Sequence, residues 1–192
     1  MIGVEAAIRI VELASARLCG GSGPQKRNGR SADNGGRTAI STSSQALRRA
    51  AWLPTAEALP LSAIEELATG LPGGVQLETD NLAQPAVFSP EAGRVLLNLL
   101  LLAADSLPGG GSVALAGSAE DVFVRITGPG AAWPANVAAL VHDEAAALTA
   151  LPTEAGMQSA LAVLLARQAG LRLSLVIPPN RQPAPPILRL SA

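Results

Sequence analysis

The sequence predicts an α+β protein, a two-layer sandwich of helices on a sheet, preceded by an N-terminal helical element. Two observations support this fold class. Apolar and polar residues alternate at 75–78, 113–126 and 171–177, and this period of two is typical of half-buried strands. Segments with helical spacing are clustered between these strand-like segments, which favours a two-layer sandwich. Because aromatic residues make up 2% of the chain, Leu, Val, Ile and Ala must build the core.

The N-terminal region contains two predicted helices separated by a polar segment. Residues 1–19 carry apolar side chains at helical spacing, which predicts an amphipathic helix that needs a packing partner. Residues 20–44 are rich in Gly, Ser, Asn and basic residues and contain one isoleucine, so we expect a flexible segment. A short second helix is predicted over 45–52, and Pro54 ends it.

The remaining residues predict helices and strands in a mixed order. Ser62 and Glu65 have the spacing of a capping box, and Ser89 followed by Pro90 is typical of a helix start. The predicted elements are a helix at 62–70, strands at 75–78 and 85–88, a helix at 89–106, a hairpin at 111–127, helices at 134–149 and 153–169, a strand at 171–177, and an edge strand at 187–192.

Charge and composition exclude several classes of function. The chain holds 14 basic and 15 acidic residues, so no overall field favours nucleic acid or a membrane as a partner. Cys19 is the single cysteine, which excludes an internal disulfide, and one Cys with one His is too few for a usual metal site. The longest apolar run is too short to span a bilayer, and residues 1–20 lack the pattern of a secretory signal. We therefore expect a soluble, cytoplasmic protein.

The order of elements resembles the ATPase-like domain of histidine kinases, the Bergerat or GHKL fold. That family carries Asn-Leu-x-x-Asn-Ala in its long helix, and NLLLLA from Asn98 places Leu102 at the asparagine that holds magnesium. The family's Asp-x-Gly-x-Gly element resembles ITGPG, with Ile126 at the adenine-binding aspartate and Gly128, Pro129 and Gly130 after it. The glycine-rich lid is reduced to EAGMQSALAVLLARQAG.

These departures argue against nucleotide binding. Leucine offers no oxygen to a hard cation, and an adenine donor buried without its acceptor costs about 1–3 kcal/mol. We therefore expect the fold of an ATPase domain without a bound cofactor or metal. Asn98 is expected to hydrogen-bond nearby backbone instead of a ligand.

Four segments resemble the ChpT-like histidine phosphotransferases: LRRAAW, LPLSAIEELATGLPGGVQLE, RVLLNLLLLAADSLPGGGSVAL and MQSALAVLLARQAGLRLSL. The resemblance implies a dimerisation and phosphotransfer-like region at 1–55 and a degenerate ATPase-like domain at 56–192. In this family an N-terminal helical hairpin forms a four-helix bundle in a homodimer. A histidine on the bundle moves phosphoryl groups between response-regulator receiver domains, and the phosphate originates from a hybrid histidine kinase.

The expected phosphoacceptor is missing from this sequence. The family's His-Asp pair follows a Leu-Cys, but here Gly20 and Gly21 follow Cys19. The one histidine, His142, precedes Asp143 in the ATPase-like half, and a solvated surface histidine is favoured there over a phosphoacceptor. A deletion, a degenerate paralogue or a reading-frame error each gives this pattern. Two functions stay open: an impaired histidine phosphotransferase, or a non-catalytic scaffold that binds receiver domains.

Three other features are weighed as sites. Cys19 has no histidine near it in sequence, so an incidental thiol is favoured over a nucleophile. The glycines at 109–111 lack the Lys and Ser/Thr of a P-loop, so a loop leading into the hairpin is favoured over a phosphate cradle. Arg27, Arg30 and Arg37 form a basic run without interleaved aromatic residues, which favours a solvated loop over a nucleic-acid site.

Overall fold

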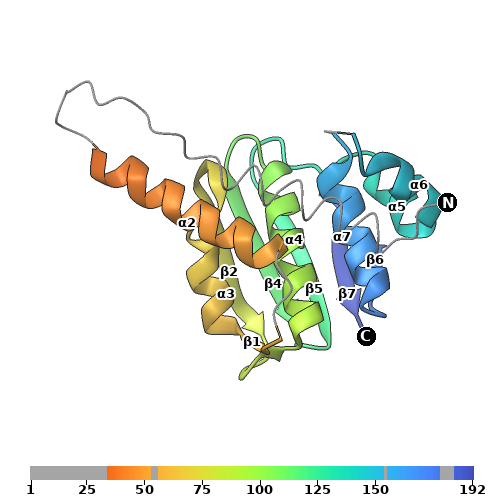
Figure 1. The fold of residues 1–192 in the computed structure, drawn as a ribbon, viewed down its shortest axis with the longest axis horizontal. Coiled ribbons are helices and arrows are strands. Elements are labelled where there is room, and N and C mark those ends of the chain that lie inside the picture. Colours follow the sequence, from red (N-terminus) through yellow and green to blue (C-terminus); the bar gives the residue numbers. More distant parts are fainter. Residues whose placement is uncertain (1–33, 53–55, 154, 178–183) are drawn as a thin grey trace.

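A five-stranded mixed sheet forms one layer of the molecule and helices form the other, which confirms the predicted α+β sandwich (Figure 1). This is a computed structural model, and it describes residues 34–52, 56–153, 155–177 and 184–192. The elements are α2 (Asn34–Trp52), β1 (Leu59–Pro60), α3 (Leu61–Ala68), the 3-10 helix η1 (Pro72–Gly74), β2 (Val75–Leu82), β3 (Val87–Phe88), α4 (Pro90–Asp105), β4 (Gly111–Gly117), β5 (Asp121–Thr127), α5 (Val137–His142), α6 (Glu144–Ala150), α7 (Met157–Gln168), β6 (Arg172–Val176) and β7 (Ile187–Ser191).

The strand order of the large sheet is β2-β4-β5-β7-β6. β2 runs parallel to β4, and the other neighbours are antiparallel, with Leu115 opposite Val124 in the predicted hairpin. β7 lies between β5 and β6, so the prediction of an edge strand at 187–192 is wrong, and β6 is the edge. Leu188 pairs with a residue on each side, which satisfies the backbone of β7 along both edges. Sequence pattern carries no information on strand order.

Helix α4 is the centre of the core. Ser89 is its N-cap, with Oγ accepting from the Ala92 amide at 3.1 Å, and Pro90 follows in the first turn, as predicted. Every residue from Val95 to Ala104 is buried, and the helix packs against α2 on one side and α7 on the other. A helix that is apolar on nearly all sides is stable only when neighbours cover it.

The start of α2 differs from the prediction. The helix begins at Asn34, so the flexible segment expected over 20–44 is wrong for 34–44, while residues 1–33 lie outside the described residues. Leu47 and Ala51 are fully buried in the core and hold the C-terminal half of the helix. Once a helix is held in this way, each further turn adds hydrogen bonds at little cost. The division of the chain near residue 55 stays a prediction.

Two local predictions are also corrected. α3 follows Pro60 without a side-chain cap, and Glu65 accepts a hydrogen bond from Thr79 Oγ1 at 2.7 Å, so there is no capping box. The helix expected over 134–149 is two short helices that meet at Asp143. The extended backbone of Asp143 ends α5, and its Oδ1 accepts from the Ala146 amide at 3.1 Å to cap α6.

Candidate functional site

The positions that resemble nucleotide ligands lie on α4 and β5 in the interior of the sandwich. Leu102 and Ile126 are 2% and 1% exposed and belong to the single apolar core. The resemblance places the family's lid just before α7, and α7 packs directly on α4. Aliphatic carbon neither ligates a cation nor accepts a hydrogen bond, so these two positions contribute packing and no ligand chemistry.

Asn98 forms a polar junction in this apolar core. Its side chain is fully buried, and Nδ2 donates to the carbonyl oxygens of Ala51 at 2.7 Å and Arg94 at 2.9 Å. Gln158 on α7 donates through Nε2 to Asn98 Oδ1 at 3.2 Å and to the Asn98 backbone oxygen at 3.1 Å. The prediction that Asn98 bonds nearby backbone is confirmed. The side chain connects α2, α4 and α7, because each helix supplies one of its partners.

The same junction fixes the end of α2. The last carbonyls of a helix have no hydrogen-bond donor within the helix. At the end of α2, side chains of α4 donate to these carbonyls. Asn98 serves Ala51, and Arg94 Nη2 donates to the Trp52 oxygen at 2.9 Å. At the middle of α2, Ser44 Oγ donates to the Gly70 oxygen, beyond the end of α3, at 2.7 Å. The C-terminal half of α2 is therefore held on the sandwich by polar contacts as well as by its buried apolar side chains.

The two glycine-rich loops contact each other at one end of the sheet. Gly111 has a φ of 141°, and a Cβ there would lie 2.2 Å from the Thr127 oxygen. A Cβ on Gly128 would lie 2.3 Å from the Gly110 oxygen. The loop at 109–111 leads from α4 into β4, as predicted, and its glycines permit a close approach of two backbones. That approach explains why both segments contain glycine, without reference to a phosphate.

His142 is the last residue of α5 and is exposed, as is Asp143. Within the described residues, its imidazole makes no hydrogen bond or ion pair, and the Asp143 carboxylate is engaged as the cap of α6. Arg167 on α7 donates from Nη2 to the backbone oxygen of Val141, the residue before His142, at 2.8 Å. This is the solvated surface position that the sequence favoured. Its chemistry as a phosphoacceptor stays untested.

The other candidates fall outside this geometry. Cys19, Gly20, Gly21, Arg27 and Arg30 lie outside the described residues, and the structure describes only the helical backbone at Arg37. Among the described residues there is no group of three or more His, Cys, Asp or Glu placed to hold a metal ion. None of the described helices combines the length and the apolar character needed to cross a bilayer.

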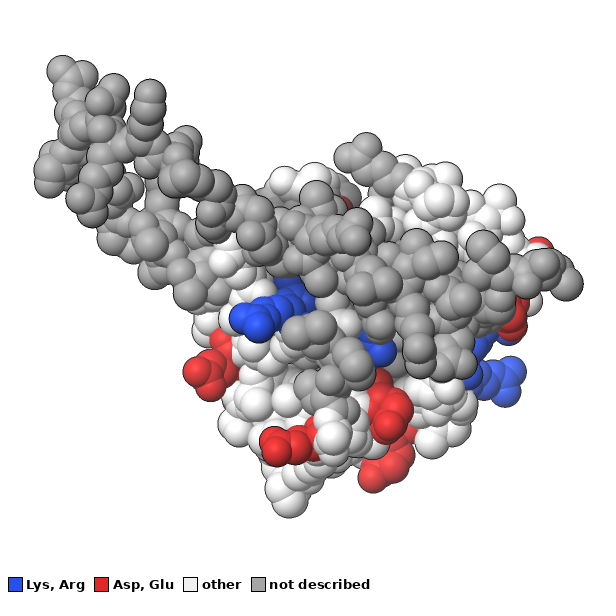
Figure 2. Space-filling view, in the orientation of Figure 1, with Lys and Arg blue, Asp and Glu red and all other residues white. Residues whose placement is uncertain are grey.

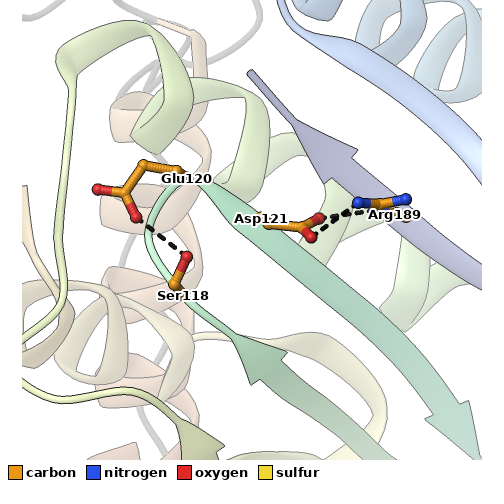
Figure 3. Close-up of polar contacts among 4 residues, drawn as sticks. All are labelled: Ser118, Glu120, Asp121 and Arg189. Atoms are coloured by element: carbon orange, nitrogen blue, oxygen red, sulfur yellow. Dashed lines mark hydrogen bonds and ion pairs between the residues drawn. The ribbon is translucent and has the colours of Figure 1, made fainter.

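One charged pair was missed by sequence reasoning because its partners are far apart in the chain. Asp121 on β5 and Arg189 on β7 meet in a two-pronged contact, Nε to Oδ1 at 2.7 Å and Nη2 to Oδ2 at 2.8 Å (Figure 3). The hydrogen bond from Arg189 lowers the pKa of the Asp121 carboxyl, and the guanidinium also lies 5.4 Å from the centre of the Phe123 ring. Both side chains are more than a third exposed, so this pair is a surface contact between strands.

Comparison with known proteins gives the family. The family model described as the histidine phosphotransferase C-terminal domain matches residues 61–181. A search of curated proteins finds no significant match. A solved bacterial phosphotransferase is similar over 97% of this chain and 86% of its own, with 18% identity and a TM-score of 0.59, which shows a shared fold.

Two kinases are similar at lower scores. The mycobacterial sensor histidine kinase MprB matches 71% of this chain and 95% of its own at 17% identity, with a TM-score of 0.46. The histidine kinase domain of the blue-light-activated kinase of Erythrobacter litoralis matches 96% of this chain and 83% of its own at 14% identity, with a TM-score of 0.47. The family match covers more than half of the chain and agrees with the shared fold, so this chain belongs to the histidine phosphotransferase family of two-component signalling proteins.

Proposed function

We propose that this protein is a histidine-phosphotransferase-like component of a bacterial phosphorelay that docks receiver domains and binds no ATP. The observation that supports it best is the filled interior: Leu102 and Ile126 are buried where the resemblance expects magnesium and adenine ligands. The fold is thus kept while the ligand chemistry is lost. We further propose that the protein is a cytoplasmic homodimer whose N-terminal helices form the bundle, with a hybrid histidine kinase as the source of phosphate.

Phosphoryl transfer by this chain is expected to be impaired. A phosphorelay histidine attacks the phosphorus of a receiver's aspartyl phosphate, the acyl phosphate bond breaks, and the aspartate carboxylate leaves. The full sequence holds one histidine, His142, and glycines stand at the usual acceptor position. We therefore expect no phosphorylation at that position.

The test is a transfer assay with a radiolabelled phospho-receiver. We expect the receiver to co-elute with the chain in gel filtration while the chain gains no acid-labile label. A receiver lacking its phosphoacceptor aspartate is the control for label that arises without transfer. Acid-labile label on the chain that disappears in His142→Ala would make His142 the acceptor and overturn the expectation that the chain gains no label. Absence of co-elution as well as of label would overturn the proposal itself.

The alternative function, a non-catalytic scaffold for receiver domains, is favoured by the isolated and exposed position of His142. The same assay separates the two functions. Stable co-elution with no phosphoryl exchange in either direction indicates the scaffold, whereas slow exchange indicates an impaired transferase. A separate measurement addresses the nucleotide: magnesium ATP at millimolar concentration should leave the unfolding temperature unchanged, because a ligand stabilises only a fold that binds it.

A further inference from the structure

β6 is an edge strand of the large sheet, and a groove borders it. β6 pairs with β7 on one side, and no strand in the described part of the chain pairs with its other side. A strand edge presents backbone N–H and C=O groups that pair readily with an added extended segment. The question is whether the surroundings of this edge select a particular kind of segment.

A groove of about 370 Å³ lies along the first half of β6. Its walls are the last turn of α5, the C-terminal half of α7 and the turn between α7 and β6. Its apolar lining includes Val163, Ala166 and Leu173, which are all buried. His142, Arg167 and Arg172 are exposed lining residues. The groove therefore combines an apolar floor with a basic rim.

The charges on this rim are only partly balanced. Arg167 Nη1 lies 3.7 Å from Glu144 Oε2, an exposed pair that offsets part of its charge. Asp143, which precedes Glu144 in the chain, serves as the cap of α6. The side chain of Arg172 makes no hydrogen bond or ion pair with another described residue, although its backbone lies in the ladder with β7. Figure 2 shows arginine side chains in blue at this end of the molecule, near α7 and β6, with acidic side chains in red beside them.

The strand edge, the apolar floor and the basic rim indicate which kind of segment could bind in the groove. An arginine with five donors and no acceptor matches the two oxygens of a carboxylate. A second copy of β6 would supply no carboxylate, because Arg-Leu-Ser-Leu-Val contains no acidic residue. An extended segment with alternating acidic and apolar side chains meets both requirements, since successive side chains of a strand face opposite sides.

We propose that the free edge of β6 binds an acidic, extended segment of a partner protein as an added strand. A carboxylate of that segment pairs with Arg172, and an apolar side chain covers the floor of the groove. The partner is a protein segment, recognised by its backbone and its acidic residues. The inference goes beyond receiver docking in the phosphorelay, because it requires neither phosphoryl transfer nor the N-terminal region.

The test uses a fluorescein-labelled short peptide in which valine and glutamate alternate, titrated with the full chain and followed by anisotropy. One control peptide carries lysine in place of glutamate, and another carries proline at alternate positions, which removes the N–H donors that strand pairing needs. We expect the acidic peptide to bind and both controls to bind at least about tenfold more weakly. Amides of β6 should gain protection from hydrogen exchange when the acidic peptide is bound.

Variants locate the site. Arg172→Glu should weaken binding by about tenfold or more, because a charge-assisted contact becomes a repulsive one. Arg125→Glu is the matched control, since Arg125 is exposed on β5 and does not line the groove, and it should change the affinity by less than about twofold. Circular dichroism checks that both variants fold.

Each contrary result overturns the inference. No binding of the acidic peptide at millimolar concentration excludes the site, and equal binding of the lysine peptide excludes charge recognition. Equal binding of the proline peptide excludes strand addition, and an unchanged affinity in Arg172→Glu excludes this groove. Failure of receiver co-elution or phosphoryl exchange would leave the peptide result intact, so the two proposals fail separately.

Discussion

Replacement of Asn98 by aspartate tests whether the buried junction is structural. The two side chains have nearly the same shape, but aspartate loses the Nδ2 donor that serves Ala51 at 2.7 Å and Arg94 at 2.9 Å. The Ala51 carbonyl lies at the end of α2, so it has no other intrahelical partner. Leaving one buried acceptor unsatisfied costs about 1–3 kcal/mol, and the buried acid adds a cost of similar size. We expect the free energy of unfolding to fall by roughly 2–4 kcal/mol.

The assay is urea unfolding followed by circular dichroism, together with hydrogen exchange of the last turn of α2. We expect faster exchange at Ala51 and Trp52 in Asn98→Asp, because the end of α2 loses the hydrogen bond from Asn98 and keeps the one from Arg94. Ser118→Ala is the control, since it removes an exposed hydrogen bond, Ser118 Oγ to Glu120 Oε2 at 3.0 Å, and should change stability by less than about 0.5 kcal/mol (Figure 3). A loss in Asn98→Asp no larger than that control, with unchanged exchange in α2, would refute the structural role.

Three further predictions concern other sites. Leu102→Asn should lower the free energy of unfolding by about 2–5 kcal/mol without creating magnesium ATP binding, as thermal unfolding with and without the nucleotide will show. Gly111→Ala should cost about 1–3 kcal/mol in urea unfolding, since its Cβ would meet the Thr127 oxygen. The Asp121 carboxyl has a lowered pKa in the folded state, so its stabilising effect is present above the unfolded-state pKa and is lost as the pH falls through the folded pKa. Carboxyl NMR of Arg189→Met should show that pKa raised toward its ordinary range.

Most elements of the sandwich could be predicted because their signals are local. The alternation at 113–126 and the Ser89-Pro90 start depend on neighbours in sequence, and both hold in the structure. Features set by distant residues could not be predicted. β7 is internal because both β5 and β6 pair with it, and α2 begins at Asn34 because its other end is anchored in the core. The break at Asp143 has a local signal, because an N-cap residue followed by Glu144 is typical of a helix start.

In the candidate site, too, only the features with a local sequence signal could be predicted. The absence of polar ligands at Leu102 and Ile126 could be identified from sequence, because each residue departs from a short family pattern. The partners of Asn98 could not, since Ala51 and Gln158 lie 47 and 60 residues away from it. No local pattern indicates which buried polar residues will meet across three helices.

This junction also changes what the retained asparagine indicates. A buried amide in an apolar core is destabilising unless its hydrogen bonds are made, and at Asn98 they are made to α2, to α4 and to Gln158. The residue therefore has a physical reason to persist that does not involve a nucleotide, whereas Leu102, one helical turn away, fills space as an apolar residue should. An asparagine at this position in a related chain is evidence for ATP binding only where no Gln158 equivalent and no α2 carbonyl occupy its side chain. By the same reasoning, loss of Asn98 should loosen the attachment of α2 to the sandwich and leave an ATP-binding assay unchanged.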